Sequence, residues 1–142
     1  MRKSIDMTLL QSFRRYLKIR NIDELQSSSD SSSIIFRHNN LYYVYIYDSD
    51  NPYYFRLLLP RIADYSNIDE AKLNKMALEA SAEYKIAKFV VIENQIWASF
   101  EQIILDADSE NSEIYDMGIR ILAACYQRVK DYLSTYVQNS QD

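Results

Sequence analysis

The chain has 142 residues and a mass of 16.8 kDa, the size of one domain with a single hydrophobic core. It contains one glycine, two prolines, one cysteine and one histidine, which excludes a glycine-rich phosphate loop, a disulfide framework and a zinc site of cysteine and histidine. The net charge of −4 and the pI near 5.0 disfavour binding to a nucleic-acid backbone. We therefore expect a single domain over residues 1–142, with no cofactor, no metal and no nucleic-acid partner.

The charge is unevenly distributed along the chain. Residues 1–20 carry a net charge of +5, and the remainder carries −9. No apolar segment of useful length follows the two basic residues at the start, so a secretory signal is not expected. The longest apolar runs, such as Phe89–Ile92, are too short to span a bilayer. These features predict a cytoplasmic protein without a membrane span.

A first helix is predicted to begin after Asp6 or Thr8, because Thr8 and Gln11 have the spacing of a capping box. Apolar residues then recur at intervals of three and four, and the helix is expected to end near Arg20. These apolar residues are Leu9, Leu10, Phe13, Tyr16 and Leu17. The serine-rich segment 27–33 cannot pack into a core and is expected to be a mobile loop.

A hairpin is predicted from strands at 34–37 and 41–47. Asn39-Asn40 is its expected turn, because asparagine tolerates a positive φ, and this turn places Phe36 opposite Tyr43. A third strand is predicted at 53–62, and symmetric pairing across the polar loop 48–52 would place Phe55 opposite Tyr45 and Leu57 opposite Tyr43. The two registers agree on one apolar face. That face comprises Ile34, Phe36, Tyr43, Tyr45, Phe55, Leu57 and Leu59.

A second hairpin is predicted from strands at 86–92 and 96–104. A turn at Asn94-Gln95 would place Lys88 opposite Glu101, which is a favourable cross-strand pair. A turn one residue earlier would break that pair but keep every side chain on the same face.

Two further helices complete the expected order. The second helix is predicted to begin at Ser66 or Asn67, and the last at Ser109 or Ser112, with a frayed tail over 137–142. The buried stripe of the second helix is Leu73, Met76, Ala77 and Ala80. The wider stripe of the last helix is Ile114, Met117, Ile121, Leu122, Cys125, Val129, Tyr132, Leu133 and Tyr136.

The order α-β-β-β-α-β-β-α predicts an α+β fold, with a five-stranded, mostly antiparallel sheet and helices packed on it. This order resembles the class I type III secretion chaperones and their YbjN-like relatives. The more specific likeness is the segment KFVVIENQIWASFEQIIL at 88–105, with Trp97-Ala98-Ser99 in the second strand, before an acidic turn and a long final helix. The turns here use asparagine where those relatives usually have glycine or aspartate. The resemblance implies a small cytoplasmic protein, often dimeric, that binds other proteins, and it brings no catalytic residue.

Catalytic and metal-binding patterns are weak. His38 lies at a predicted turn and Cys125 on an apolar helix stripe, so a reactive Cys–His pair is not expected. The acidic run at 106–112 has the alternation of a calcium loop, but its sixth and twelfth positions are Asn111 and Met117 rather than glycine and glutamate. We expect these acids to favour a helix N-terminus, and we predict that the chain is not an enzyme.

The first helix has Arg14, Arg15 and Lys18 beside its apolar stripe. Such a helix fits a membrane surface or an acidic partner. The alternative, which we favour, is a helix packed on the sheet with a solvated basic flank.

The second sheet face is also rather apolar, and two interpretations remain open for it. Either the second helix or the serine loop covers it, or it is a surface for another protein. The hypothesised protein-binding residues are Tyr42, Tyr54, Arg56, Leu58, Trp97 and Ile103. The expected function is that of a chaperone-like, adaptor or regulatory domain. A homodimer is a further expectation. Strand addition at a sheet edge is a second route by which a partner could bind. The alternative is a small-molecule-binding or hydrolytic domain that uses tyrosine, arginine and aspartate groups in a pocket.

Overall fold

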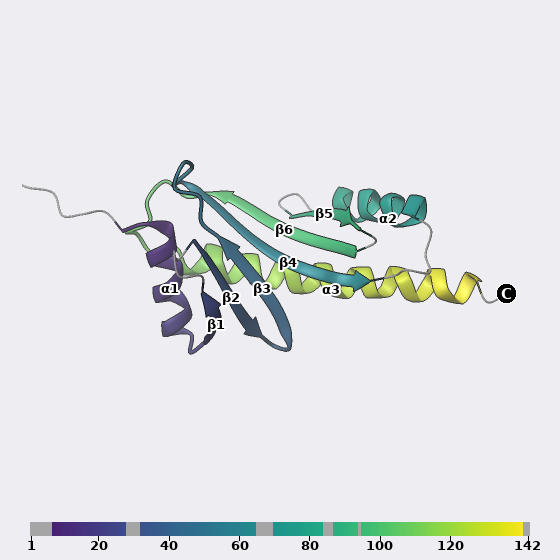
Figure 1. The fold of residues 1–142 in the computed structure, drawn as a ribbon, viewed down its shortest axis with the longest axis horizontal. Coiled ribbons are helices and arrows are strands. Elements are labelled where there is room, and N and C mark those ends of the chain that lie inside the picture. Colours follow the sequence, from purple (N-terminus) through teal and green to yellow (C-terminus); the bar gives the residue numbers. More distant parts are fainter. Residues whose placement is uncertain (1–6, 28–31, 65–69, 84–86, 94, 141–142) are drawn as a thin grey trace, which may run out of the picture.

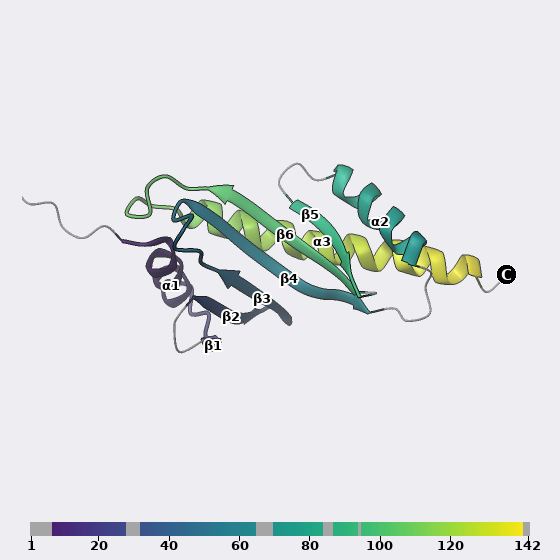
Figure 2. The same cartoon turned by 45° about the horizontal axis from the view of Figure 1, so that its top comes forward.

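The computed structural model describes residues 7–27, 32–64, 70–83, 87–93 and 95–140, which form three helices and an open antiparallel sheet of six strands (Figures 1 and 2). The α+β class predicted from the sequence is confirmed. In chain order the elements are α1 (Leu9–Ile19), β1 (Glu24–Ser27), β2 (Ser33–His38), β3 (Leu41–Ile46), β4 (Tyr54–Asp64), α2 (Glu70–Glu83), β5 (Ala87–Ile92), β6 (Gln95–Ile103) and α3 (Ser112–Ser140).

The sheet has the order β1-β2-β3-β4-β6-β5, and each neighbouring pair is antiparallel. The prediction of five strands is wrong, because β1 adds a strand at the edge beside β2. Its sequence ELQS has no apolar alternation, and its register shifts between Glu24 and Gln26. Pairing with β2, rather than a pattern of its own, makes this segment a strand. Ser27 and Ser33 consequently belong to strands, and the rest of the predicted serine loop, residues 28–31, lies outside the described residues.

The turn between β2 and β3 is as predicted, with φ of 50° at Asn39 and 67° at Asn40, and it pairs Phe36 with Tyr43. The predicted register between β3 and β4 is wrong by two residues, because Tyr45 pairs with Leu57. The connecting loop forms two successive turns, in which the N–H of Asn51 donates to the carbonyl of Asp48 and the N–H of Tyr54 donates to the carbonyl of Asn51. These turns move the centre of the β3–β4 hairpin one residue toward β4. A shift of two residues is one full side-chain period, so the predicted faces are unchanged.

The hairpin of β5 and β6 turns one residue earlier than the favoured prediction. Ile92 pairs with Gln95, and Lys88 lies opposite Ser99 rather than Glu101. The residue that permits this turn is Glu93, which has a φ of 51°. Lys88 still reaches Glu101 diagonally, with 3.4 Å between Nζ and Oε2.

Local signals define the ends of the helices. Thr8 and Gln11 form the predicted capping box, because each side chain accepts a hydrogen bond from the other's backbone N–H, at 3.1 Å and 3.0 Å. Helix α1 ends at Ile19 with Arg20 as its C-cap, and α3 begins at Ser112. Helix α3 is described as far as Ser140, beyond the predicted start of fraying, and the predicted caps of α2 at positions 66 and 67 lie outside the described residues.

All three helices contribute to one core on one face of the sheet. Helix α3 runs behind the sheet in both ribbon views, and α1 packs at the end that carries β1 and β2 (Figures 1 and 2). Phe13 of α1 is the aromatic centre, because its ring contacts five other rings at centroid distances of 5.0–5.6 Å. Those rings belong to Tyr16, Phe36, Tyr45, Phe55 and Tyr115. The seven predicted core-face residues are all buried, and the apolar stripe of α1 packs on the sheet as favoured from the sequence.

Candidate functional site

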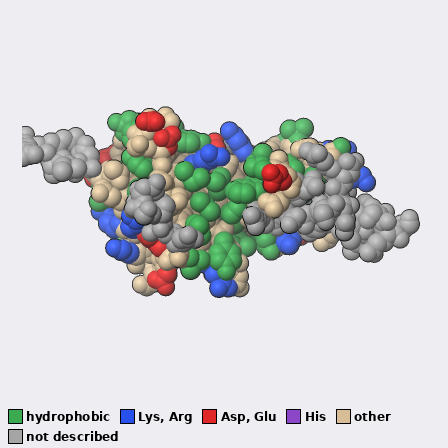
Figure 3. Space-filling view, viewed as in Figure 1, with side chains coloured by type: hydrophobic (Ala, Val, Ile, Leu, Met, Phe, Trp, Pro, Cys, Tyr) green, Lys and Arg blue, Asp and Glu red, His purple; other side chains and the backbone are tan. Residues whose placement is uncertain are grey.

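The outward face of the sheet, opposite the three helices, carries large hydrophobic side chains that remain exposed. We call this surface the open face. Figure 3 shows hydrophobic side chains gathered over the middle of the sheet, with lysine and arginine side chains beside them. The exposed fractions run from 38% for Ile46 to 58% for Ile103. The most exposed of these side chains are Tyr42, Ile46, Val90, Ile92 and Ile103. No helix within the described residues covers them.

Strand alternation places all six residues hypothesised from the sequence on the open face. Tyr54, Arg56 and Leu58 alternate along β4, and their partners on β6 are Ile103, Glu101 and Ser99. Tyr42 lies on β3, and Trp97 lies on β6 opposite Val90 of β5. The six residues therefore span three strands of one surface.

The six residues differ in how far a partner can reach them. Tyr42 and Ile103 are exposed, whereas Tyr54 and Trp97 are half-buried. Leu58 is only 7% exposed and Ser99 8%, so together they form the floor of the surface rather than its anchors. The indole N–H of Trp97 is buried and has no hydrogen-bond partner among the described residues.

A small charge cluster interrupts the apolar surface at β6. The carboxylate of Glu101 lies between Arg56 of β4, with Nε–Oε1 3.8 Å, and Lys88 of β5, with Nζ–Oε2 3.4 Å. Burial, together with a hydrogen bond to Glu101, raises the pKa of the Tyr54 hydroxyl above its usual value. Glu101 is thus the common partner of two cations and one phenol.

Arg37 provides a third basic group on the same face. Its guanidinium lies 5.7 Å from the ring centre of Tyr42 and donates a 2.7 Å hydrogen bond to the side-chain oxygen of Asn40. The cation therefore stacks on an exposed aromatic ring, which keeps both side chains at the surface.

The outer edges of the sheet are partly protected. On β5, the backbone N–H of Phe89 donates a 2.9 Å hydrogen bond to the hydroxyl of Ser81 on α2, so this helix occupies the edge where an added strand would pair. At the other edge, β1 is short and irregular, and Glu24 is held by Arg14 at 2.6 Å. Sequence reasoning missed Ser81, since nothing in the pattern of α2 marks a serine that faces a strand edge.

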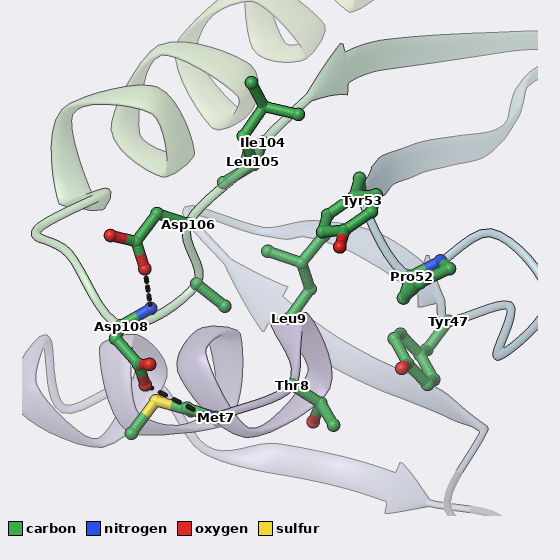
Figure 4. Close-up of a pocket in the computed structure, with 11 residues that line it drawn as sticks. Met7, Thr8, Leu9, Tyr47, Pro52, Tyr53, Ile104, Leu105, Asp106 and Asp108 are labelled. Atoms are coloured by element: carbon green, nitrogen blue, oxygen red, sulfur yellow. Dashed lines mark hydrogen bonds between the residues drawn. The ribbon is translucent and has the colours of Figure 1, made fainter. Parts of the chain in front are cut away.

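A cavity of about 620 Å³ lies beside the N-terminus of α1, and Figure 4 shows its lining. Its two carboxylates serve the loop itself, because Asp106 accepts the N–H of Asp108 and Asp108 accepts the N–H of Met7, each at 3.0 Å. The described residues contain no group of three or more histidine, cysteine, aspartate or glutamate side chains placed to hold a metal. These acids fasten the start of α1 to the turn before α3.

A second cavity, of about 340 Å³, brings tyrosine, arginine and carboxylate groups together. The hydroxyl of Tyr16 donates to Asp116 at 2.5 Å, and Arg20 donates to the other carboxylate oxygen at 2.7 Å. The hydrogen bond from Arg20 lowers the pKa of Asp116, whereas burial raises the pKa of Tyr16. His38 and Arg120 also line this cavity. The sequence did not reveal the cluster, because Tyr16 and Asp116 are 100 positions apart and no motif links them.

The single cysteine is a core residue. Cys125 is fully buried on α3, and burial raises the pKa of its thiol to about 12. A thiol of this kind is protonated and unreactive near neutral pH.

Comparison with known proteins identifies no family for this chain. No protein-family model matches the chain, and no curated protein matches it. Within the part of the chain that the structure describes, no helix combines the length and apolar character needed to cross a bilayer.

Proposed function

We propose that this chain is a non-enzymatic, cytoplasmic protein-binding domain, chaperone-like or adaptor in kind, of the sort implied by its resemblance to the YbjN-like proteins. Its open face would hold an extended or partly folded segment of another protein. The observation that carries the proposal is the cluster of exposed hydrophobic side chains on one sheet face, which no described helix covers. Contiguous apolar surface of this kind is typical of interaction sites.

The chemistry of the face supports a protein partner. Tyr42, Tyr54 and Trp97 offer large contact areas at a low cost in side-chain entropy, and Arg56 adds directional hydrogen bonds. Binding by strand addition is less well supported, because Ser81 already bonds to the backbone of Phe89 on β5. The face, rather than an edge, is therefore the proposed site.

The test compares exposed positions on and off the open face. Ile103→Lys changes a side chain that is 58% exposed on the face, and Leu78→Lys changes one that is 72% exposed on α2. Both variants should keep the stability of the wild type, because neither removes a core side chain. Partners captured from native extract and then verified by titration with purified components should be lost with Ile103→Lys and retained with Leu78→Lys. Retention of the same partners at the same affinity by both variants would refute the proposal.

A second copy of the chain is another occupant that the face could accept. Sedimentation equilibrium at micromolar concentration distinguishes this case, and a dimer that Ile103→Lys dissociates would place the homodimer interface on the open face. The Trp97→Ala, Tyr54→Ala double variant extends the test to the half-buried side chains, with its folding checked by circular dichroism.

A small-molecule-binding or hydrolytic domain is the alternative function, and the cavity at Tyr16, Arg20 and Asp116 is the observation that favours it. Against it, these three groups already satisfy one another's hydrogen bonds. A thermal-shift screen of small carboxylates, phosphates and esters tests the alternative, because a true ligand should raise the melting temperature of the wild type but not that of Arg120→Ala.

A further inference from the structure

The charged side chains that the structure describes on the open face have a net charge opposite to that of the whole chain. The net charge of the chain is −4, yet the charged side chains described on this face are three basic and one acidic. They are Arg37, Arg56, Lys88 and Glu101. The described side chains of this face therefore carry two positive charges in excess, although the net charge of the whole chain is negative.

The arrangement at the centre directs this excess outward. Glu101 is the recessed member of its cluster, with a side chain 25% exposed, whereas Arg56 is 45% exposed and Lys88 is 74% exposed. Arg56 and Lys88 stand on the two strands that flank β6, so they lie on opposite sides of Glu101. One carboxylate cannot neutralise two cations, and both cations keep N–H donors available to a partner.

Apolar groups lie on both sides of this cluster along the strands. In one direction Tyr54 pairs with Ile103, and in the other Trp97 pairs with Val90. Glu101 is two residues from Ile103 and four from Trp97, which corresponds to about 7 Å and about 13 Å along a strand. The surface thus alternates apolar, basic and apolar at the spacing of side chains on an extended or helical segment.

We propose that the open face binds an apolar segment of another protein that carries an acidic side chain, with that carboxylate seated between Arg56 and Lys88 and its apolar neighbours on the Tyr54–Ile103 and Trp97–Val90 pairs. This inference rests on the proposed function and names the chemistry of its partner. A second copy is the less favoured occupant, because two open faces brought together would each present the same positive excess.

The sole tryptophan provides a direct readout, since Trp97 lies on the face itself. The probes are three short synthetic peptides with one alternating leucine and serine sequence, which differ only in a central glutamate, glutamine or lysine. Titration followed by Trp97 fluorescence should rank glutamate tightest and lysine weakest. At low salt the glutamate peptide should bind about fivefold more tightly than the glutamine peptide, and this preference should disappear near 1 M salt, where the Debye length is about 3 Å.

Charge variants test the placement of the carboxylate. The Arg56→Gln, Lys88→Gln double variant should bind the glutamate and glutamine peptides equally. The matched control is Lys72→Gln, Lys75→Gln, which removes the same charge from exposed positions on α2 and should keep the preference.

The outcomes separate this inference from the function on which it rests. Equal affinity of the wild type for all three peptides, or an equal loss of preference in the α2 control, overturns the acidic-partner inference and leaves protein binding in place. Failure of every peptide to bind, by fluorescence and by sedimentation, contradicts the proposed function as well. A stable dimer that must dissociate before any peptide binds makes the second copy the occupant and also overturns the inference.

Discussion

Replacing Gly118 by alanine should destabilise the fold, although alanine is the better helix former. A Cβ at position 118 would lie 2.8 Å from Cδ2 and 3.0 Å from Cε2 of the Phe100 ring. Phe100 is fully buried on β6 beneath α3, so its ring has little room to move. The gain in helix propensity is about 1 kcal/mol, and overpacking of a dense core costs about 1–3 kcal/mol. We expect a net loss of about 1 kcal/mol in the free energy of unfolding.

Urea denaturation followed by circular dichroism measures this loss as a lower midpoint at an unchanged slope. The control is a double-mutant cycle with Phe100→Leu, which shortens the side chain that the new methyl group meets. Phe100→Leu alone should be destabilising, but Gly118→Ala should become neutral or stabilising in that background. If Gly118→Ala alone were more stable than the wild type by the full gain in helix propensity, the close approach of α3 to β6 would be refuted.

Three further outcomes follow from local contacts. Thr8→Ala should cost about 1 kcal/mol of stability in urea denaturation, because it removes the capping box with Gln11, whereas an unchanged midpoint would mean that the box is not formed in solution. The thiol of Cys125, with its pKa raised to about 12, should react with an aromatic disulfide reagent only after unfolding, so rapid reaction of the native protein at pH 8 would contradict its burial. The hydrogen bond from Arg20 lowers the pKa of the Asp116 carboxyl group in the folded protein. As the pH falls, Asp116 is therefore protonated in the unfolded chain before it is protonated in the folded protein. The ionised Asp116 therefore contributes its full stabilisation above the usual aspartate pKa of about 3.9 and loses it as the pH falls below that value. In Asp116→Asn, the free energy of unfolding should depend less steeply on pH in acid than in the wild type. Parallel pH profiles for the two proteins would exclude the interaction.

Much of the architecture could be predicted from neighbouring residues alone. The capping box at Thr8 and the Asn39-Asn40 turn are bonds within a few positions, so local sequence specifies them. The buried face through Phe36 and Tyr45 follows from a period of two, which survives even the two-residue error in the register between β3 and β4. The same alternation predicts that Tyr54 and Trp97 share one surface, and the strand registers confirm it.

Only the tertiary structure decided which contacts join distant segments. Strand β1 forms because β2 offers an unpaired edge, and its own sequence ELQS carries no signal for it. The hydroxyl of Ser81 meets the edge of β5 only when α2 packs there, and Tyr16 meets Asp116 only when α1 and α3 converge. Which sheet face stays open depends on all three helices packing on the same side. A side-chain period identifies two faces but does not say which one another element will bury, because burial depends on the free energy of the whole packed core.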